Sequence, residues 1–254
     1  MKITLLGTGT SQGVPVIACD CEVCKSTNFK DKRLRSSVMI EVDDQNFVID
    51  TGPDFRQQML REKVERLDAV LFTHHHKDHV AGMDDIRAFN HKWKRDMQIY
   101  CTDITASALR NEFPYVFSKD NYPGVPKVSI NTITNKPFKI QDIFITPIQA
   151  KHYLMPIFGF RIKDFVYLTD VSSISQKEKE KMQDADLIIL DALRKKEHIS
   201  HFNLNQALAL LDELQPKQAL LTHISHYMGL HDDVNKELPT NIKLAYDSQQ
   251  VVLS

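Results

Sequence analysis

Short runs of apolar and β-branched residues alternate along the chain with segments of helical periodicity. The runs predict strands over Ile3–Leu6, Val38–Val42, Phe47–Ile49, Ala69–Phe72, Gln98–Tyr100, Ile143–Thr146, Phe165–Leu168, Leu187–Leu190, Ala219–Leu221, Lys243–Ala245 and Val251–Leu253. The periodic segments predict helices over Asp54–Lys63, His79–Asn90, Ile104–Asn111, Ile174–Met182 and Leu204–Leu214. Because the strands come in blocks and helices follow each block, we expect two packed sheets with helices outside them.

Two longer segments, "PFKIQDIFITPIQA" and "FGFRIKDFVYLTD", predict paired strands joined by tight turns. The proline-containing stretch Tyr115–Lys127 predicts a surface loop that is too short for a domain linker. The sequence has neither a short-period repeat nor a Gly/Ser-rich linker. We therefore predict a single α/β domain over residues 1–254.

The composition is that of an ordinary globular protein, with 42% hydrophobic and 26% charged residues. No apolar run approaches the roughly 20 residues that span a bilayer, and the amino-terminal "MKITLLGTGT" is not typical of a signal peptide. We therefore expect a cytoplasmic protein without a membrane partner, whose four cysteines are not disulfides. The formal net charge of -1 provides no overall basic surface for nucleic acid, so we expect no nucleic acid partner. A homodimer is left open.

The stretch "LFTHHHKDHVAG" follows a predicted strand and has no structural need for so many imidazoles. Side chains alternate along a strand, so His75 and Lys77 are expected to turn away from the face that their neighbours share. A strand end and a helix start can direct four side chains into one cleft: His74, His76, Asp78 and His79. Imidazole and carboxylate ligands suit Zn, Mn or Fe, and this number of ligands favours two metals over one closed tetrahedral site.

A second candidate metal site lies in "CDCEVC", which places Cys19, Cys21 and Cys24 within six residues. Thiolates at this spacing suit a structural tetrahedral zinc, which needs one more ligand, while ordinary reduced thiols are the alternative. Cys101, in the predicted strand "QIYC", is expected to be a small buried hydrophobic residue.

"THHHKDH" resembles the metal-binding motif of the metallo-β-lactamase superfamily, whose αββα four-layer sandwich holds a binuclear centre between its sheets. Four further segments resemble the remaining family motifs: "VIDTG" with Asp50, "QAKHYLMP" with His152, "VYLTD" with Asp170 and "ALLTHIS" with His223. The resemblance implies one metal bound by His74, His76 and His152, and a second bound by Asp78, His79 and His223. It further implies that Asp170 bridges the two metals and that Asp50 supports the site without binding metal.

The cysteine cluster resembles that of the subgroup containing the phosphoribosyl 1,2-cyclic phosphate phosphodiesterase. In that subgroup a histidine three residues beyond the last catalytic ligand completes the cluster, and His226 in "THISH" stands at this position. "LLGTGTSQGVP" and "KDKRLRSSVMI" are also similar to this subgroup. The resemblance thus implies one structural zinc bound by Cys19, Cys21, Cys24 and His226.

The function implied by the resemblance is hydrolysis of a small cyclic phosphodiester by a hydroxide that bridges two Zn or Mn ions. His201 and Asp78 are the candidate catalytic residues, and a capping box from Asn203 to Gln206 is predicted to stiffen the chain beside His201. His198 is the other candidate for contacting the phosphate, and the sequence leaves the choice open.

Three other functions are considered. A ribonuclease Z-like activity on precursor tRNA is less favoured, because the 30 residues between Asp170 and His201 contain no glycine/proline-rich arm. A metalloprotein related to pyrroloquinoline quinone biosynthesis would share the cysteine cluster. A non-catalytic metal-bound scaffold is disfavoured by the complete set of candidate ligands.

Overall fold

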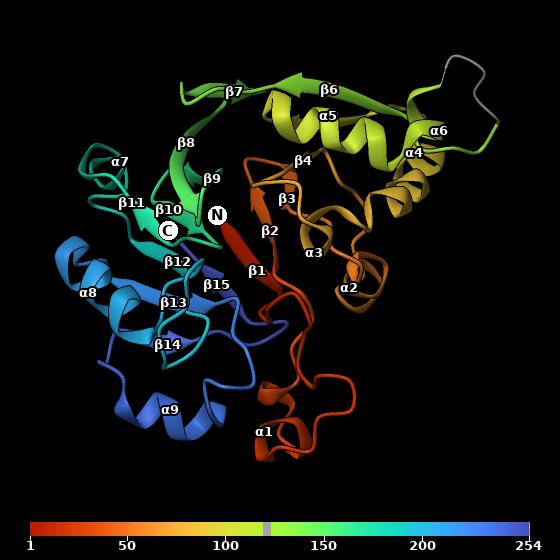
Figure 1. The fold of residues 1–254 in the computed structure, drawn as a ribbon. Helices are drawn as coiled ribbons and strands as arrows, with labels where there is room; N and C mark the ends of the chain where they lie inside the picture. Colours follow the sequence, from red (N-terminus) through yellow and green to blue (C-terminus); the bar gives the residue numbers. More distant parts are fainter. Residues whose placement is uncertain (119–122, 254) are drawn as a thin grey trace.

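The protein, described by a computed structural model over residues 1–118 and 123–253, consists of two facing sheets with helices on their outer sides (Figure 1). The first sheet has the order β15-β1-β2-β3-β4-β5-β6, with β1 Lys2–Gly7, β2 Ser37–Val42, β3 Gln45–Ile49, β4 Ala69–Leu71, β5 Met97–Cys101, β6 Val128–Thr132 and β15 Gln250–Val252. Strands β3 to β6 are parallel, whereas β1, β2 and β15 pair antiparallel.

The second sheet has the order β11-β8-β9-β10-β12-β13-β14, and β7 pairs with β8 outside this path. Its strands are β7 Phe138–Ile140, β8 Ile143–His152, β9 Met155–Ile162, β10 Phe165–Leu168, β11 Ser173–Ile174, β12 Leu187–Asp191, β13 Gln218–Thr222 and β14 Ile242–Leu244. Strands β10, β12, β13 and β14 run parallel, so their carboxyl ends meet at one edge. This edge faces the carboxyl ends of β3 and β4 across the sandwich, where the histidine motif lies.

The helices cover the outer faces of the sheets, with α2 to α5 on the first sheet and α8 and α9 on the second (Figure 1). The α-helices are α1 Glu22–Lys25, α2 Phe55–Arg61, α3 Lys77–Val80, α4 Arg87–Trp93, α5 Asp103–Glu112, α6 Pro114–Phe117, α7 Gln176–Glu180, α8 Leu204–Leu214 and α9 His231–Glu237. Two 3₁₀ turns, η1 Phe29–Asp31 and η2 Met83–Ile86, complete the helical segments described. The predicted αββα four-layer sandwich is confirmed.

The alternation of side chains along each strand builds these layers. In β4, Leu71 packs into the apolar cluster between the two sheets, whereas Val70 packs into the cluster beneath α2, α4 and α5. In β12, Ile189 faces the inner cluster, while Ile188 packs against residues of α8. Both sides of each central strand are therefore apolar, as expected for a parallel strand covered on both faces.

The predicted continuous helix His79–Asn90 is wrong: the chain forms α3, then η2, then α4. The interruption lies at Gly82, where a Cβ atom would meet the Gly52 carbonyl oxygen at 2.1 Å. In turn, a Cβ atom on Gly52 would meet the Asp78 carbonyl oxygen at 2.1 Å. The two glycines thus let the segment after β3 lie directly against the histidine motif, and this contact breaks the helix.

Other predictions differ from the structure at the periphery. The predicted surface loop Tyr115–Lys127 begins inside α6, and its residues 119–122 lie outside the described part of the chain. Strand β6 and helix α9 were not predicted from the sequence pattern. In the ranges that the structure describes, no helix combines the length and the hydrophobicity that crossing a membrane requires.

Candidate metal centre

The predicted ligands of the binuclear site, together with Asp50, stand at or just beyond strand ends on one edge of the sandwich. Asp50 directly follows β3, and the histidine motif follows β4. On the second sheet, His152 is the last residue of β8, while Asp170 and His223 follow β10 and β13. Asp50, Asp170 and His223 adopt positive φ angles of 65°, 61° and 56°, a left-handed conformation that turns each side chain at the strand end toward the cleft.

Asp50 orients two histidines without lying in the ligand cluster itself. Its Oδ2 accepts a hydrogen bond of 2.7 Å from His79 Nδ1 and one of 2.8 Å from the Thr73 hydroxyl. Since that hydroxyl donates to Asp50, its oxygen accepts from His74 Nδ1 at 2.9 Å. Both imidazoles thereby carry their proton on Nδ1 and present Nε2 to the cleft. This supporting role is the one predicted for Asp50.

The second predicted ligand set lies around the bridging candidate Asp170. Ligand atoms of Asp78, His79, Asp170 and His223 all lie within 4.8 Å of one another. Asp170 Oδ1 is 3.4 Å from His79 Nε2 and 3.2 Å from His223 Nδ1. The structure therefore brings together the four residues that the resemblance placed here.

The first predicted set is arranged more openly, at the rim of the cleft. The ring centroid of His76 lies 4.7 Å from that of His74 and 5.0 Å from that of His152. Asp170 Oδ2 is 3.9 Å from His74 Nε2. His152 donates from Nδ1 to the Ser200 carbonyl at 2.8 Å, which leaves its Nε2 free for a metal.

His201 stands closer to this first set than the sequence suggested. Ligand atoms of His152, Asp170 and His201 lie within 4.8 Å of one another, so the group could share a metal in geometric terms. The His201 ring also stacks on His223 at 5.0 Å, while His198 lies behind it at 5.2 Å. His201 thus contacts residues of both ligand sets.

The chemistry of the donor set fits divalent metals. Three buried ring nitrogens, His74 Nε2, His79 Nε2 and His223 Nδ1, have no hydrogen-bond partner within the described residues. Leaving such atoms buried and unpaired costs about 1–3 kcal/mol each unless a ligand satisfies them. Each of these nitrogens lies within 4 Å of an oxygen of Asp170.

The charges in the cleft also favour the binding of cations. Burial would raise the pKa of Asp170, but the neighbouring His223 and His79 outweigh burial and hold it well below its usual range. Burial would likewise raise the pKa of Asp78, but the charge and the hydrogen bond of His79 outweigh burial and lower it. Both carboxylates are therefore ionised at neutral pH and available to cations.

Of the two residues predicted to turn away, Lys77 does so: it is exposed and pairs with Glu112 on α5. His75 is half-buried, and its ring centroid lies 5.9 Å from that of His76. Cys101 is fully buried, and burial raises the pKa of its thiol to about 12, in agreement with its predicted structural role.

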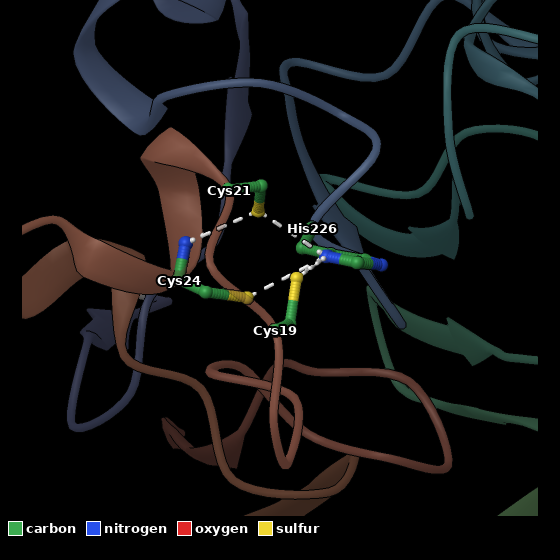
Figure 2. A group of neighbouring side chains, drawn as sticks. All are labelled: Cys19, Cys21, Cys24 and His226. Carbon is green, nitrogen blue, oxygen red and sulfur yellow. Dashed lines mark hydrogen bonds between the residues drawn. The ribbon is translucent and has the colours of Figure 1, made fainter.

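The cysteine cluster forms a separate site, shown in Figure 2. His226 Nδ1 lies 3.2, 3.4 and 3.5 Å from the sulfurs of Cys19, Cys21 and Cys24. Tetrahedral zinc with ordinary Zn–S and Zn–N lengths would separate such atoms by about 3.5 Å. The Cys24 amide, donating to the Cys21 sulfur, lowers the pKa of that thiol to about 6, which favours the thiolate that zinc needs.

One residue of the cleft was missed from the sequence. Asp191 ends β12, is fully buried, and has its Oδ2 3.5 Å from His201 Nδ1. Burial, followed by the charge of Asp170, raises the pKa of Asp191 well above its usual range. A signal was available, since "LIILD" is an apolar strand that ends in a carboxylate at the same edge as Asp170.

Comparison with known proteins places this site in a family. Residues 45–224 match the model of the Beta-lactamase superfamily domain. The crystal structure of a new diphosphatase from the PhnP family superposes with a TM-score of 0.93 and 35% identity, covering 100% of this chain and 98% of the other. The chain belongs to the PhnP family of the beta-lactamase superfamily.

Further relatives of this PhnP-family protein are known. An octanoyltransferase from Porphyromonas gingivalis is 37% identical over 256 residues, covering 100% of the chain but 52% of the relative, so the chain spans about half of that protein. Two solved structures share the fold over the whole of both chains. Zn(2+)-bound PqqB from Methylobacterium extorquens has 17% identity and a TM-score of 0.83, and human tRNase Z, short form, has 18% identity and a TM-score of 0.75. These structures show that the PhnP-family protein has the metallo-β-lactamase fold.

Proposed function

We propose that the protein is a metal-dependent phosphodiesterase acting on a small cyclic phosphodiester of the phosphoribosyl 1,2-cyclic phosphate type. The observation that carries this proposal is the position of His201. Its buried imidazole contacts His152 of one ligand set and His223 of the other. A substrate phosphate bound between the two ligand sets would therefore contact His201. Hydrolysis of a phosphodiester needs such a group, because the leaving oxygen requires a proton.

The ligands would hold two divalent cations, Zn or Mn, with His74, His76 and His152 at one and Asp78, His79 and His223 at the other. Such cations would neutralise the charge on the phosphate oxygens and activate a water molecule for attack. Asp170 stands between the sets, and Asp50 keeps two histidines in the tautomer that can bind metal. His201 donates a proton to the leaving oxygen or binds the phosphate. A third, structural zinc belongs to Cys19, Cys21, Cys24 and His226.

The relatives support the reaction class more than the substrate. A diphosphatase of the PhnP family cleaves at a phosphorus atom, as the proposed phosphodiesterase does. In a cyclic phosphodiester and in a diphosphate diester alike, the attacked phosphorus bears two bridging oxygens. The described loop between Asp170 and His201 contains only β11, α7 and β12 as regular elements, which favours a small substrate over precursor tRNA.

The first prediction is selective hydrolysis of small phosphodiesters. The metal-loaded protein would be given a ribose 1,2-cyclic phosphate, a dinucleoside diphosphate, a precursor tRNA, an octanoyl thioester and a β-lactam. We expect turnover of the cyclic phosphate to exceed that of the tRNA and the thioester at least about a hundredfold in kcat/KM. Efficient 3′ processing of the tRNA with inert cyclic phosphate would replace this proposal with the nuclease function, and preference for the diphosphate would change the substrate but not the reaction class.

The second prediction concerns His201. His201→Ala should lower kcat about 10²–10⁴-fold, because a positioned proton donor contributes that much. Metal content, measured by elemental analysis, should stay the same, since His201 is proposed to meet the substrate. His198→Ala is the matched control, because His198 lies behind His201 on the same loop. Loss of a metal from His201→Ala would make it a ligand, and a larger effect of His198→Ala would transfer the phosphate contact to that residue.

A further inference from the structure

The cysteine cluster differs from a fully enclosed structural site in the accessibility of its sulfurs. Cys21 is exposed and Cys19 is half-buried, whereas Cys24 has 6% of its surface exposed. The thiolate that binds zinc is also the nucleophilic form of cysteine, and oxidants react most readily with thiolates that face solvent. Cys101 provides the contrast within the same chain, because it is fully buried in β5. Of these side chains, Cys21 is therefore the one that a dissolved oxidant reaches first.

Cys24 is placed to form a disulfide with Cys21. Cys21 is the N-cap of α1, and the Cys24 amide donates to the Cys21 sulfur at 3.5 Å. All the ligand atoms of the cluster lie within 4.8 Å of one another, and Figure 2 shows the three sulfurs and the His226 ring pointing toward one another. An S–S bond of about 2.05 Å therefore needs only local movement. The spacing is that of a redox-active Cys-X-X-Cys pair, whereas Cys19 and Cys21 are only two residues apart.

The loop that carries the cysteines has little other attachment to the carboxyl-terminal half of the chain. In the described structure, the backbone hydrogen bonds of residues 15–26 stay within that segment, as between the Cys19 amide and the Val16 carbonyl. Leu230 adds a partly buried apolar contact. A zinc ion bound jointly by the cysteines and His226 would thus be the main link between this loop and the segment that follows β13.

That segment leads directly to the candidate metal centre. His226 is three residues from His223, and the amide of Ser225 between them donates to the Leu193 carbonyl at 2.9 Å. The Leu193 amide donates in turn to the carbonyl of Phe202, the residue after His201, at 3.0 Å. Movement at His226 would therefore reach a predicted ligand of the cleft and the loop of His201.

We propose that Cys21 is a modification site for hydroperoxides, with Cys24 as the resolving thiol, and that its oxidation releases the zinc and weakens the cleft. The effect on turnover rests on the proposed phosphodiesterase function, whereas the modification itself does not. The site would lower hydrolysis under oxidising conditions and restore it when a dithiol and zinc are supplied.

The chemistry balances with one hydroperoxide per disulfide. The Cys21 thiolate attacks a peroxide oxygen, so that an S–O bond forms, the O–O bond breaks and hydroxide leaves. The Cys24 thiolate then attacks the Cys21 sulfur, so that the S–S bond forms, the S–O bond breaks and a second hydroxide leaves. The two sulfurs together lose two electrons, which the peroxide gains. Zinc leaves because two of its four ligands are no longer thiolates.

The third prediction is a disulfide between Cys21 and Cys24 after the zinc-loaded protein is treated with hydrogen peroxide. Proteolysis at Asp20 and Glu22 separates the three cysteines, so mass spectrometry of the peptides identifies the linked pair. We expect a chromogenic chelator to detect release of the structural zinc in parallel with the disulfide. Cys101 should remain a free thiol, because it is fully buried. Zinc retained after full treatment, or oxidation that links no cysteines, would contradict the proposal.

Cys21→His and Cys19→His form a matched pair of variants. Imidazole is itself a zinc ligand, so each variant keeps four candidate ligands but loses one sulfur. Cys19→His should still form the disulfide and lose its zinc, whereas Cys21→His should hold its zinc for the time in which the parent loses it. Equally fast zinc loss from Cys21→His would remove Cys21 from its role. If either variant fails to bind zinc, the peptide mapping of the parent protein still decides the assignment.

The effect on the cleft has a measurement that does not depend on turnover. Competition with a chelator should show that oxidation lowers the affinity of the cleft for Mn or Zn about tenfold, within the usual range of coupling between two sites. The value of kcat/KM should fall in parallel at limiting metal, and a dithiol with added zinc should restore both. A disulfide with unchanged cleft affinity would exclude the regulatory effect. If the protein hydrolyses no phosphodiester before oxidation, the proposed function fails, whereas the disulfide, zinc and affinity measurements still test this proposal.

Discussion

Replacement of Asp170 by asparagine is expected to lower kcat at least about a thousandfold while the protein stays folded. The Asp170 carboxylate faces unpaired nitrogens of His74, His79 and His223, and it supplies the negative charge between the two ligand sets. Asparagine keeps the shape but not the charge, so cations at both positions should bind more weakly and be misplaced. Loss of a single hydrogen-bond donor to a charge that develops in the transition state already costs about 10²–10³-fold.

The choice of asparagine follows from the backbone. Asp170 has a φ of 61°, a left-handed conformation that asparagine and aspartate adopt more easily than most residues. Asp170→Ala would add backbone strain to the loss of charge, and comparison of the two variants separates these effects. The measurements are kcat, metal content by elemental analysis, and the thermal midpoint. A kcat close to that of the parent in Asp170→Asn would exclude a bridging role.

The second large effect is expected at the cysteine site. Cys21→Ser should lower the free energy of unfolding by about 3–5 kcal/mol, because loss of a bound metal is among the few changes that cause large losses of stability. The reason is that the amino-terminal loop has almost no core of its own: its apolar cluster contains only Val14, Val23 and Cys24 as buried members within the described chain. Structural zinc binding is coupled to folding, so removing a thiolate ligand releases the loop.

Zinc content provides the independent measurement for this variant. The parent should approach three metals per chain, and Cys21→Ser should approach two. Cys101→Ala is the control, because Cys101 is a buried cysteine of β5 far along the chain from the cluster. It should lose stability through the core but keep its full zinc content. If Cys21→Ser melts like the parent with an unchanged zinc content, the four residues are not a zinc site.

The sequence predicted the layers well, because their cause is local. Continuous apolar runs such as Phe47–Ile49 and Leu187–Leu190 place apolar side chains on both faces of a strand and so require a covering layer on each side, and the structure supplies both. The predicted helix His79–Asn90 failed because its interruption depends on Gly52, which is 30 residues away and packs against the same turn. Periodicity does not contain such contacts. Strand β6 has no fully buried residue, so its pattern gave no signal.

For the site too, residues in local motifs were predicted, whereas roles that depend on contacts between distant segments were not. The structure brings Asp78, His79, Asp170 and His223 together. It places His74 and His76 next to them, since a motif such as "THHHKDH" fixes residue type, spacing and strand end together. Asp191 was missed because a single aspartate at a strand end is common, and its meaning depends on His201 arriving from a different loop. The closeness of His201 to His152 and Asp170 was also absent from the sequence, because it is set by the pairing of Ser200 with His152.

The segment from His223 to His226 connects the two candidate metal sites, and this has a consequence for how the protein would mature. The amino-terminal chain bonds to it directly: the Thr10 hydroxyl lies 3.3 Å from His223 Nε2, and the Ile224 amide donates to the Thr8 carbonyl. Zinc at the cysteines would therefore fix the position of the short segment that also presents His223 to the cleft. Loading of the two sites should therefore be cooperative, because a cation at either site would order the segment that the other site uses.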